Sequence, residues 1–349
     1  MNEISPQKPI LVTGAAGFIA SWIVKYLLDD GYTVHGTVRD KSNLVKVAHL
    51  EDMANKSVGK LHLFEADLLQ QGSYAAAMKG CQLVIHTASP FQPKVKNPQK
   101  DLIEPALEGT RNVLQTVNEL EEVQRVVLTS SVVAIMGDAS EIDDTENGIF
   151  TEDHWNLSSS LKHQPYAYSK TLAEKEAWRM NQIQDRWTLA VINPAFVLGP
   201  SLSRRQDSFS TDFMLSMVNG KNRTGMPDLT FAIVDVRDVA QAHIKAGFNS
   251  NAKGRHVTCA ETVKIMEMAA ILQSFFGNKY PLPKRELPTW MVYIFGPLQG
   301  LSWKYLNKNL GFHFEFDNQY SIQDLGLEYR PVEETLVDQV KELEAKGLV

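Results

Sequence analysis

Tyr166 and Lys170 are the pair of residues in this 349-residue chain whose types and spacing point most directly to chemistry. On a helix, positions i and i+4 lie on one face, so the two side chains can present a phenol and an ammonium group to the same small volume. Reduction of a ketone or aldehyde by a nicotinamide needs a hydride, a proton for the developing alkoxide and a donor that polarises the carbonyl. The pair therefore suggests acid–base catalysis, with Tyr166 as the acid.

A serine pair supplies the third group. Ser131 closes a strand-like segment that contains Thr129 and Ser130, and its hydroxyl is predicted to donate to the carbonyl oxygen of a substrate. Ser130 is expected on the opposite face because strand side chains alternate. A free tyrosine has a pKa of about 10, so Lys170 and the oxidised nicotinamide together are predicted to lower the pKa of Tyr166. Lys170 is also expected to hold the nicotinamide ribose. The alternative is that Tyr166 simply begins an exposed amphipathic helix.

A glycine turn near the start of the chain indicates a dinucleotide site. The apolar segment Pro9–Thr13 runs into Gly14 and Gly17, and an apolar helix pattern follows. Gly14 permits the tight turn, Gly17 lets the backbone approach a pyrophosphate, and the helix N-terminus faces the phosphates. The alternative is a turn that binds nothing, which the strand and helix patterns on either side disfavour. The residues predicted to contact the cofactor here are Thr13, Gly14, Ala16, Gly17, Phe18 and Ile19.

The end of the second predicted strand bears on the choice of cofactor. A basic residue at this place accommodates the 2′-phosphate of NADP, whereas an acidic residue holds the ribose hydroxyls of NAD. Arg39 can form a forked contact with a phosphate, and Lys46 can add a point charge. NADPH is therefore the predicted cofactor. The alternative is that Arg39 is a solvated charge and that Asp40 binds the ribose.

Further cofactor contacts are predicted at the ends of later strands, because ligands bind at the carboxyl edge of a doubly wound sheet. Asp67 and Leu68 follow the third strand, where related folds place a carboxylate near the adenine. The remaining candidates are Thr87, Ala88, Ser89, Thr129, Ser130, Pro194, Ala195 and Val197, in addition to Tyr166 and Lys170.

The fold class follows from the alternation of short apolar segments, rich in β-branched residues, with segments of helix length. Such alternation predicts an α/β fold with a doubly wound parallel sheet of the Rossmann type, covered by helices on both faces. The pattern loosens after Pro194, where a smaller C-terminal lobe is predicted. We assign 1–195, with a return segment at about 230–250, to the NADP-binding domain, and 196–229 with 251–349 to the substrate-binding lobe.

Composition limits the range of partners. The net charge is −6, with 35 basic and 41 acidic residues, and no block of like charge suits nucleic acid or an anionic membrane. Cys81 and Cys259 are the only cysteines, and no spacing typical of a metal site is found. We therefore expect a cytoplasmic protein with reduced thiols, no metal and no membrane segment, which acts on a small molecule as a monomer or homodimer.

The glycine turn, Arg39, Ser131, Tyr166–Lys170 and Asn193–Ala195, in this order, make the chain resemble the extended short-chain dehydrogenase/reductases. Within them it looks like the dihydroflavonol 4-reductase group, which includes microbial aldehyde and ketone reductases. The resemblance runs from about Pro9 to Phe248 and thins after that. It implies a Rossmann fold, NADP(H) as cofactor and reduction of a carbonyl group.

Departures from the group bear on the substrate. Met136 stands where plant flavonoid reductases carry an asparagine, and the cysteine-containing signature of cinnamoyl-CoA reductases is absent. Ala106 stands where many relatives keep an asparagine for proton relay, so the relay here must use water or another group. The predicted substrate contacts are Phe91, Val133, Met136 and Phe196. These mostly apolar walls favour an apolar or aromatic carbonyl compound of modest size.

The leading hypothesis is NADPH-dependent reduction of an aldehyde or ketone, with Tyr166 as acid, Ser131 polarising the carbonyl and Lys170 tuning the tyrosine. A sugar-nucleotide epimerase or dehydratase, which keeps NAD tightly bound, is the alternative enzyme. Arg204 and Arg205 keep it open, because such a substrate requires basic groups against its diphosphate. A non-catalytic NADP-sensing protein is the third possibility, although such proteins usually lack the Tyr–Lys pair.

Overall fold

A seven-stranded parallel sheet is the main feature of the computed structural model, which describes residues 4–89, 95–203 and 208–349. The strand order is β10-β7-β5-β4-β1-β2-β3. Neighbouring strands pair in parallel throughout, and the order changes direction between β1 and β4. This is the arrangement of a doubly wound sheet, so the predicted fold class is confirmed.

The elements of this layer alternate along the chain. The strands are β1 (Ile10–Thr13), β2 (Thr33–Val38), β3 (Lys60–Glu65), β4 (Leu83–His86), β5 (Arg125–Thr129), β7 (Thr188–Pro194) and β10 (Gly254–Thr258). The helices that pack on them are α1 (Phe18–Asp29), α2 (Leu44–Lys56), α3 (Ala75–Met78), α4 (Glu104–Glu119), α5 (Pro165–Gln182), α7 (Val236–Phe248) and α11 (Gln319–Leu325).

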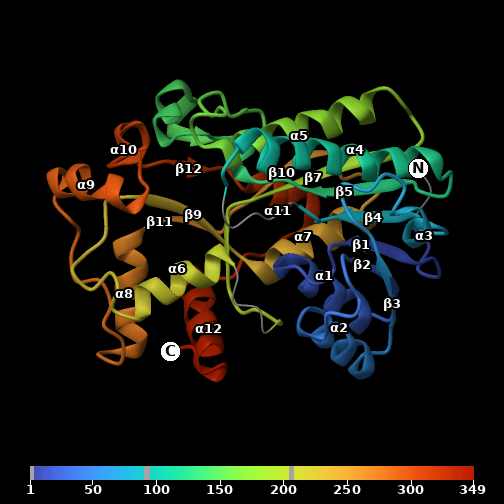
Figure 1. Cartoon of the computed structure of the whole chain (residues 1–349), viewed down its shortest axis with the longest axis horizontal. Coiled ribbons are helices and arrows are strands. Elements are labelled where there is room, and N and C mark those ends of the chain that lie inside the picture. Colours follow the sequence, from blue (N-terminus) through green and yellow to red (C-terminus); the bar gives the residue numbers. More distant parts are fainter. Residues whose placement is uncertain (1–3, 90–94, 204–207) are drawn as a thin grey trace.

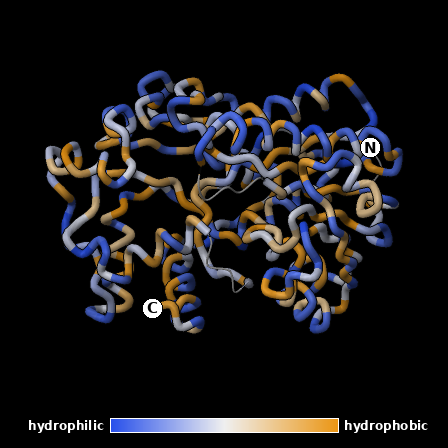
Figure 2. Tube along the Cα trace, viewed as in Figure 1, coloured by the Kyte–Doolittle hydropathy of each residue, from blue (hydrophilic) through white to orange (hydrophobic). Residues whose placement is uncertain are grey.

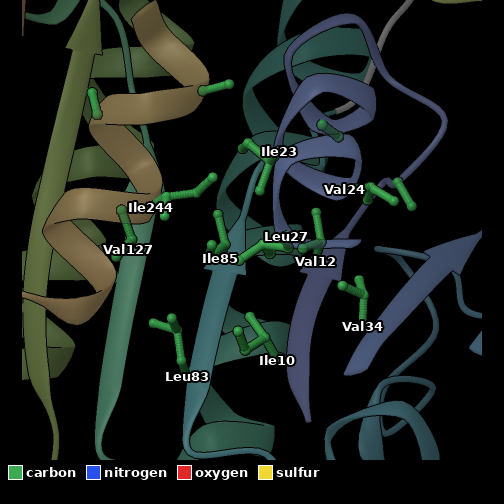
Figure 3. Close-up of a cluster of buried hydrophobic side chains, with 14 of the residues drawn as sticks. Ile10, Val12, Ile23, Val24, Leu27, Val34, Leu83, Ile85, Val127 and Ile244 are labelled. Carbon is green, nitrogen blue, oxygen red and sulfur yellow. The ribbon is translucent and has the colours of Figure 1, made fainter. Parts of the chain in front are cut away.

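Alternating side chains explain why both faces of the sheet are covered. Ile10 and Val12 of β1 pack with α1, α2 and α7 on one face, whereas Leu11 between them packs with α3, α4 and α5 on the other. Figure 3 shows the first of these clusters, with Ile23 and Leu27 of α1 reaching toward the strands. The strands are thus apolar on both sides, as a parallel sheet buried between helices requires.

The C-terminal part of the chain builds a second lobe around a three-stranded sheet of order β11-β9-β8. Its elements are β8 (Phe196–Leu198), α6 (Phe209–Val218), β9 (Thr230–Asp235), β11 (Glu261–Lys264), α8 (Ile265–Phe276), α9 (Thr289–Phe295), α10 (Trp303–Asn309) and α12 (Val332–Ala345). A short parallel pair, β6 (Ile149–Phe150) and β12 (Glu315–Phe316), lies beside it. Figure 1 shows α6, α8, α9, α10 and α12 on one side of the molecule and the large sheet on the other.

The two parts share a hydrophobic cluster. Val132 and Val257, from segments attached to the large sheet, pack in one cluster with Val234, Phe150 and Phe316. In Figure 2 the hydrophobic stretches lie mainly along the inner strands, whereas the outer turns are largely hydrophilic. No helix in the described ranges is both long and apolar enough to cross a membrane.

The chain returns to the large sheet later than predicted. The strand at 230–235 was expected within the return segment, but it pairs with β8 and β11 in the small sheet. The helix that follows, α7, does pack on the large sheet, and β10, which we had placed in the substrate lobe, pairs with β7 at its edge. A helix that crosses the face of a parallel sheet delivers the next strand parallel to its neighbours, and the open edge was at β7. The division into a cofactor domain and a substrate domain stays a prediction.

We expect Leu27→Ala to lower the free energy of unfolding by about 2–5 kcal/mol, because the substitution leaves a cavity between α1 and the sheet. Leu27 is fully buried, whereas Leu44, at the start of α2, is 63% exposed. Leu44→Ala is therefore the matched control and is expected to change the stability by less than about 0.5 kcal/mol. Urea denaturation followed by circular dichroism measures both values, and equal losses would contradict the packing described here.

Candidate active site

The carboxyl ends of β1, β4, β5 and β7 meet at one edge of the large sheet. A small cavity of about 20 Å³ lies there, between the sheet, α4 and α5. Its lining includes Lys170 together with the predicted cofactor residues Leu68, Ala88, Ser89, Thr129 and Ser130. The structure thus brings together side chains that lie far apart in the sequence.

The turn after β1 has a backbone that requires glycine. Gly14 has a φ of +64°, in the left-handed region, and a Cβ at this position would lie 3.1 Å from the Cα of Ala88. Thr37 holds the turn, since its hydroxyl accepts from Gly14 N (3.1 Å) and its carbonyl from Ala15 N (2.9 Å). Helix α1 begins at Phe18 with no side-chain cap and no acidic residue in its first turn. Its first N–H groups are therefore free of competition from a side chain and suit an anion.

Thr13 fixes the adjoining end of β4. Its Oγ1 accepts hydrogen bonds from the backbone N–H groups of Thr87 (3.1 Å) and Ala88 (3.0 Å), and it lies 2.8 Å from His86 Nδ1. Because the two N–H groups occupy the oxygen lone pairs, the Thr13 hydroxyl donates to His86 Nδ1 and the imidazole proton lies on Nε2. Burial, together with the charge of Lys170, lowers the pKa of His86 to about 3. His86 is thus a neutral structural residue that keeps the β1 and β4 ends together.

Arg39 and Asp40 differ in what they are free to bind. Asp40 Oδ1 accepts from the backbone N–H of Ser42 (2.8 Å) and from its hydroxyl (2.6 Å), and these bonds lower the pKa of the exposed carboxyl. Arg39 is exposed at the end of β2 and takes part in no hydrogen bond or ion pair within the described ranges. Lys46 is also exposed, on the first turns of α2. The side chains available to a phosphate are therefore the basic ones.

The segment after β3 is held by its own turn. Asp67 Oδ1 accepts from the backbone N–H of Leu69 (2.8 Å), and Asn112 Nδ2 donates to the carbonyl of Leu68 (3.0 Å). Leu68 itself lines the cavity and would contact a Cβ at Gly109 at 3.2 Å. Contact of Asp67 and Leu68 with an adenine stays a prediction.

The side chain of Lys170, from α5, reaches the carboxyl end of β5. Its Nζ donates to the carbonyl of Thr129 (3.1 Å), two residues before Ser131. The Thr129 hydroxyl lies 2.6 Å from His243 Nε2, and His243 Nδ1 lies 2.7 Å from the carbonyl of Val239. Burial lowers the pKa of His243 to about 4, so the imidazole is neutral: Nδ1 donates to Val239, and the threonine donates to Nε2. Burial lowers the pKa of Lys170 to about 8, although the nearby carboxylate of Glu174 opposes this shift. The ammonium is thus held by a backbone oxygen in a poorly solvated place.

Tyr166 opens the same helix face, at the first turn of α5. Tyr166 is 52% exposed, so its ring is accessible to a substrate. The neighbouring protein atoms nevertheless desolvate the phenol, and this raises the pKa of Tyr166. Lys170 and the oxidised nicotinamide together were predicted to lower this pKa. In the chain without a cofactor, burial raises it, and the joint effect of Lys170 and a bound nicotinamide stays a prediction. The ammonium is directed at the Thr129 carbonyl and is itself desolvated, so burial dominates the pKa of the phenol.

Ser131 and Ser130 point in different directions, as strand alternation requires. The hydroxyl of Ser131 lies 3.4 Å from the carbonyl of Pro194 and 3.3 Å from the N–H of Val133, on the partly exposed side. The hydroxyl of Ser130 instead donates to the buried Oε2 of Glu174 (2.5 Å). Ser131 is therefore the serine available to a substrate, and Ser130 holds the sheet to α5.

Sequence reasoning missed the buried group beneath the site, Glu174. Arg255 of β10 donates to it through Nε (2.6 Å), and Asn193 of β7 donates through Nδ2 (2.9 Å). Arg255 also donates to the carbonyl of Glu152 (2.8 Å), and its guanidinium stacks over the ring of Trp155, 3.9 Å from the centroid. One signal was available in the sequence, because Glu174 follows Lys170 by one helical turn. The position of Arg255 was not predictable, since β10 had been placed in the other lobe.

Ala106 lines the cavity beside Lys170. A cavity of about 20 Å³ has room for one water molecule, which needs at least about 10–15 Å³ and polar partners. The lining offers such partners in Thr110, Ser130 and Lys170. The space left by the small side chain of Ala106 is therefore consistent with the predicted use of water in proton transfer.

An aromatic cluster lies beyond the end of β7. The ring of Phe196 contacts those of Phe209, Phe213 and Phe231, with centroids 5.5, 5.3 and 5.6 Å apart. Phe209 is 69% exposed, so the cluster has an open face. Val133 and Met136 are both partly buried in the segment after Ser131, and Pro194 and Ala195 are buried at the end of β7, followed by the partly buried Val197. The predicted substrate residue Phe91 and the pair Arg204 and Arg205 lie outside the described residues.

The cysteines are structural. Cys81 and Cys259 are buried free thiols, and burial raises their pKa values to about 12 and about 11. A thiol with a raised pKa is a weak nucleophile at neutral pH. Within the described ranges, no group of three or more His, Cys, Asp or Glu side chains is placed to hold a metal ion.

Comparison with known proteins agrees with this geometry. A family model described as the NAD dependent epimerase/dehydratase family matches residues 10–260. Cinnamoyl-CoA reductase CAD2 from Medicago truncatula is 36% identical over 347 residues, which cover 97% of this chain and 96% of that protein. Dihydroflavonol 4-reductase from Gerbera hybrida is 33% identical over 300 residues, which cover 82% of this chain and 79% of that protein.

A solved structure shows the same architecture over nearly the whole chain. Gre2 from Candida albicans, in complex with NADPH, matches with a TM-score of 0.79 at 29% identity and covers 97% of this chain and 99% of its own. The resemblance to the dihydroflavonol 4-reductase group of the extended short-chain dehydrogenase/reductases is thereby confirmed. The chain belongs to the NAD dependent epimerase/dehydratase family.

Proposed function

We propose that this protein reduces an aldehyde or ketone to the alcohol with NADPH. The observation that carries the proposal is the placement of Lys170, whose ammonium binds the carbonyl of Thr129 at the strand end that continues into Ser131. The same sheet edge carries the glycine turn at Gly14, packed against Ala88. A site for a dinucleotide and a set of proton-transfer groups therefore adjoin each other. NADPH, when bound, supplies the hydride.

The choice of NADPH over NADH is supported by the residues at the end of β2. Arg39 is exposed and unpaired within the described ranges, whereas the Asp40 carboxylate is engaged by Ser42. A guanidinium forms two parallel hydrogen bonds with a phosphate, and Lys46 adds positive charge on the facing helix turn. The NADPH complex of Gre2 agrees with this choice.

Proton transfer is assigned to three side chains. The raised pKa of Tyr166 keeps its phenol protonated at neutral pH, which is the form that a proton donor to an alkoxide needs. The hydroxyl of Ser131 makes only long hydrogen bonds, to the Pro194 carbonyl (3.4 Å) and from the Val133 N–H (3.3 Å). It can therefore rotate toward a substrate carbonyl and donate to its oxygen as negative charge develops. The ammonium of Lys170, together with the positive charge of an oxidised nicotinamide, would stabilise the phenolate that remains once the proton has left Tyr166.

The substrate is proposed to be an apolar or aromatic carbonyl compound. The open face of the cluster around Phe196 and Phe209 offers aromatic contacts, which favour flat or branched apolar groups. Val133 and Met136, both partly buried on the segment after Ser131, are proposed to contact the same substrate. The names of two relatives, a cinnamoyl-CoA reductase and a dihydroflavonol 4-reductase, support a substrate with an aromatic part.

Tyr166→Phe is expected to lower the rate of carbonyl reduction by at least about 100-fold, because a general acid contributes about 10²- to 10⁴-fold. NADPH consumption with a panel of aldehydes, aryl ketones and diketones, followed by absorbance, measures the rate. Fluorescence titration with NADPH is the control and should give an unchanged Kd. A variant that keeps its activity would exclude Tyr166 as the acid. Tightly bound NAD in the purified protein, with no turnover on the panel, would favour a sugar-nucleotide enzyme instead.

Arg39→Ala is expected to raise the KM for NADPH by about 10- to 100-fold, which corresponds to the loss of about 1.5–3 kcal/mol for a hydrogen bond to a charged group. The KM for NADH should change little, because NADH lacks the 2′-phosphate. Initial rates with both cofactors at one carbonyl concentration test this. Equal effects on the two cofactors would contradict the assignment of Arg39.

The pH dependence of kcat/KM for NADPH is expected to report Lys170. Because its pKa is lowered to about 8, the ammonium is present below that pH and is lost as the pH rises through it, so kcat/KM falls on the alkaline side. Lys170→Arg keeps its charge to above pH 12, so its profile should lack this step even if its rate is lower. An unchanged alkaline limb in the arginine variant would assign the ionisation to another group.

A further inference from the structure

A fully buried carboxylate, that of Asp138, lies between the two segments that carry Ser131 and Tyr166. Its oxygens lie 2.9 and 2.8 Å from Nε2 of His163. Oδ1 also accepts a hydrogen bond from Nε2 of Gln164 (2.6 Å). Burial alone would raise the pKa of Asp138, but hydrogen bonds led by that from Asn309 outweigh burial and lower it. The group is therefore a charged acceptor that draws several donors to one point.

The backbone of Gln164 is unusual for its place in the chain. Its φ is +50°, in the left-handed region, although a residue before a proline favours an extended conformation. It caps α5, Pro165 is the first residue of that helix, and its carbonyl accepts the first helical hydrogen bond, from Tyr168 N (3.1 Å). The conformation of Gln164 thus sets the direction in which the turn with Tyr166 starts.

Two hydrogen bonds of the Gln164 side chain hold this backbone conformation, and both acceptors lie on adjacent residues of the segment after Ser131. Gln164 Nε2 donates to Asp138 Oδ1 (2.6 Å) and to the carbonyl of Gly137 (2.6 Å). A second tie lies nearby, where Asn156 donates through Nδ2 to the carbonyl of Val133 (2.6 Å) and through its backbone N to that of Ala134 (3.0 Å). The segment after Ser131 and the segment before Tyr166 are therefore bound to each other rather than to the sheet alone.

The second lobe contacts the same carboxylate. Asn309, the last residue of α10, donates through Nδ2 to Asp138 Oδ1 (2.8 Å) and accepts through Oδ1 from the N–H of Ala139 (2.9 Å). Asn309 is buried, so this contact is part of the packing between the lobes. One carboxylate thus connects the serine segment, the tyrosine segment and α10.

We propose that Asp138 is a positioning residue for the reaction: its carboxylate, through Gln164, fixes the first turn of α5 and so the position of Tyr166 relative to the segment of Ser131. The inference rests on the proposed function, because it concerns the placement of the proton donor. Strained backbone that is held by its surroundings is typical of functional sites. A misplacement of about 1 Å in a catalytic group can lower a rate by about 100-fold.

Gln164→Gly is the first test. Glycine adopts the left-handed region without cost but removes both hydrogen bonds of the Gln164 side chain. A merely structural role for this residue therefore predicts a lower unfolding temperature with an unchanged kcat. The proposal predicts that kcat falls by about 100-fold, while the KM for NADPH stays unchanged. Asn147→Gly is the matched control, because Asn147 is the other non-glycine residue with a positive φ (61°) in the described ranges. The control should keep full activity, and a Gln164→Gly enzyme that also keeps it would overturn the proposal.

A spectroscopic measurement keeps the test independent of turnover. The protein is labelled with 13C at Cζ of tyrosine, and the Tyr166 resonance is assigned by its absence from Tyr166→Phe. Gln164→Gly and Asp138→Asn should both shift this resonance, whereas Asn147→Gly should leave it in place. If the wild-type protein reduces no carbonyl compound, the proposed function fails but the resonance still decides the positioning role. An unmoved resonance in Gln164→Gly overturns that role, even if Asp138→Asn does not fold.

Discussion

The position of α5 on the large sheet depends on one buried carboxylate, that of Glu174. It accepts hydrogen bonds from Ser130 at the end of β5, from Asn193 on β7 and from Arg255 on β10. A buried ion pair adds little net stability compared with apolar packing, yet removal of one partner costs about 3–5 kcal/mol because the other charge is left without compensation. The contribution of Glu174 is therefore to the position of the helix more than to the free energy of unfolding. It fixes the register of the helix that carries Tyr166–Lys170 against the strands β5, β7 and β10.

The charges of the site follow from that placement. Lys170 lies one turn before Glu174, which opposes the effect of burial on its pKa, and Lys170 in turn helps to keep the buried His86 neutral. Positive charge and N–H groups therefore collect at the sheet edge, from Lys170, the N-terminus of α1 and the exposed Arg39. A dianionic pyrophosphate with a further phosphate is complementary to this arrangement.

Local patterns were enough to predict much of the fold and part of the site. Strand ends, the glycine turn and the spacing of Tyr166 and Lys170 depend on periods of two and on i, i+4 neighbours, which can be read from the sequence. The groups that were missed depend on distant pairing. Arg255 meets Glu174 only because β10 joins the edge of the large sheet, and Asp138 meets Gln164 only through the folded loop between them. The spacing of Tyr166 and Lys170 is visible in the sequence, but the burial that raises the pKa of Tyr166 in the chain without a cofactor is not.

Membership of a family named for epimerases and dehydratases does not by itself determine the reaction, because one fold supports many reactions and function depends on the residues of the site. One local feature bears on the cofactor. Asp40 is bound to Ser42 while Arg39 is exposed, which favours an added phosphate over a ribose diol. This feature lies at a strand end, outside the apolar layers on which the sheet depends. The same core can therefore serve different cofactors and substrates, and the residues at its edge favour a reductase in this chain.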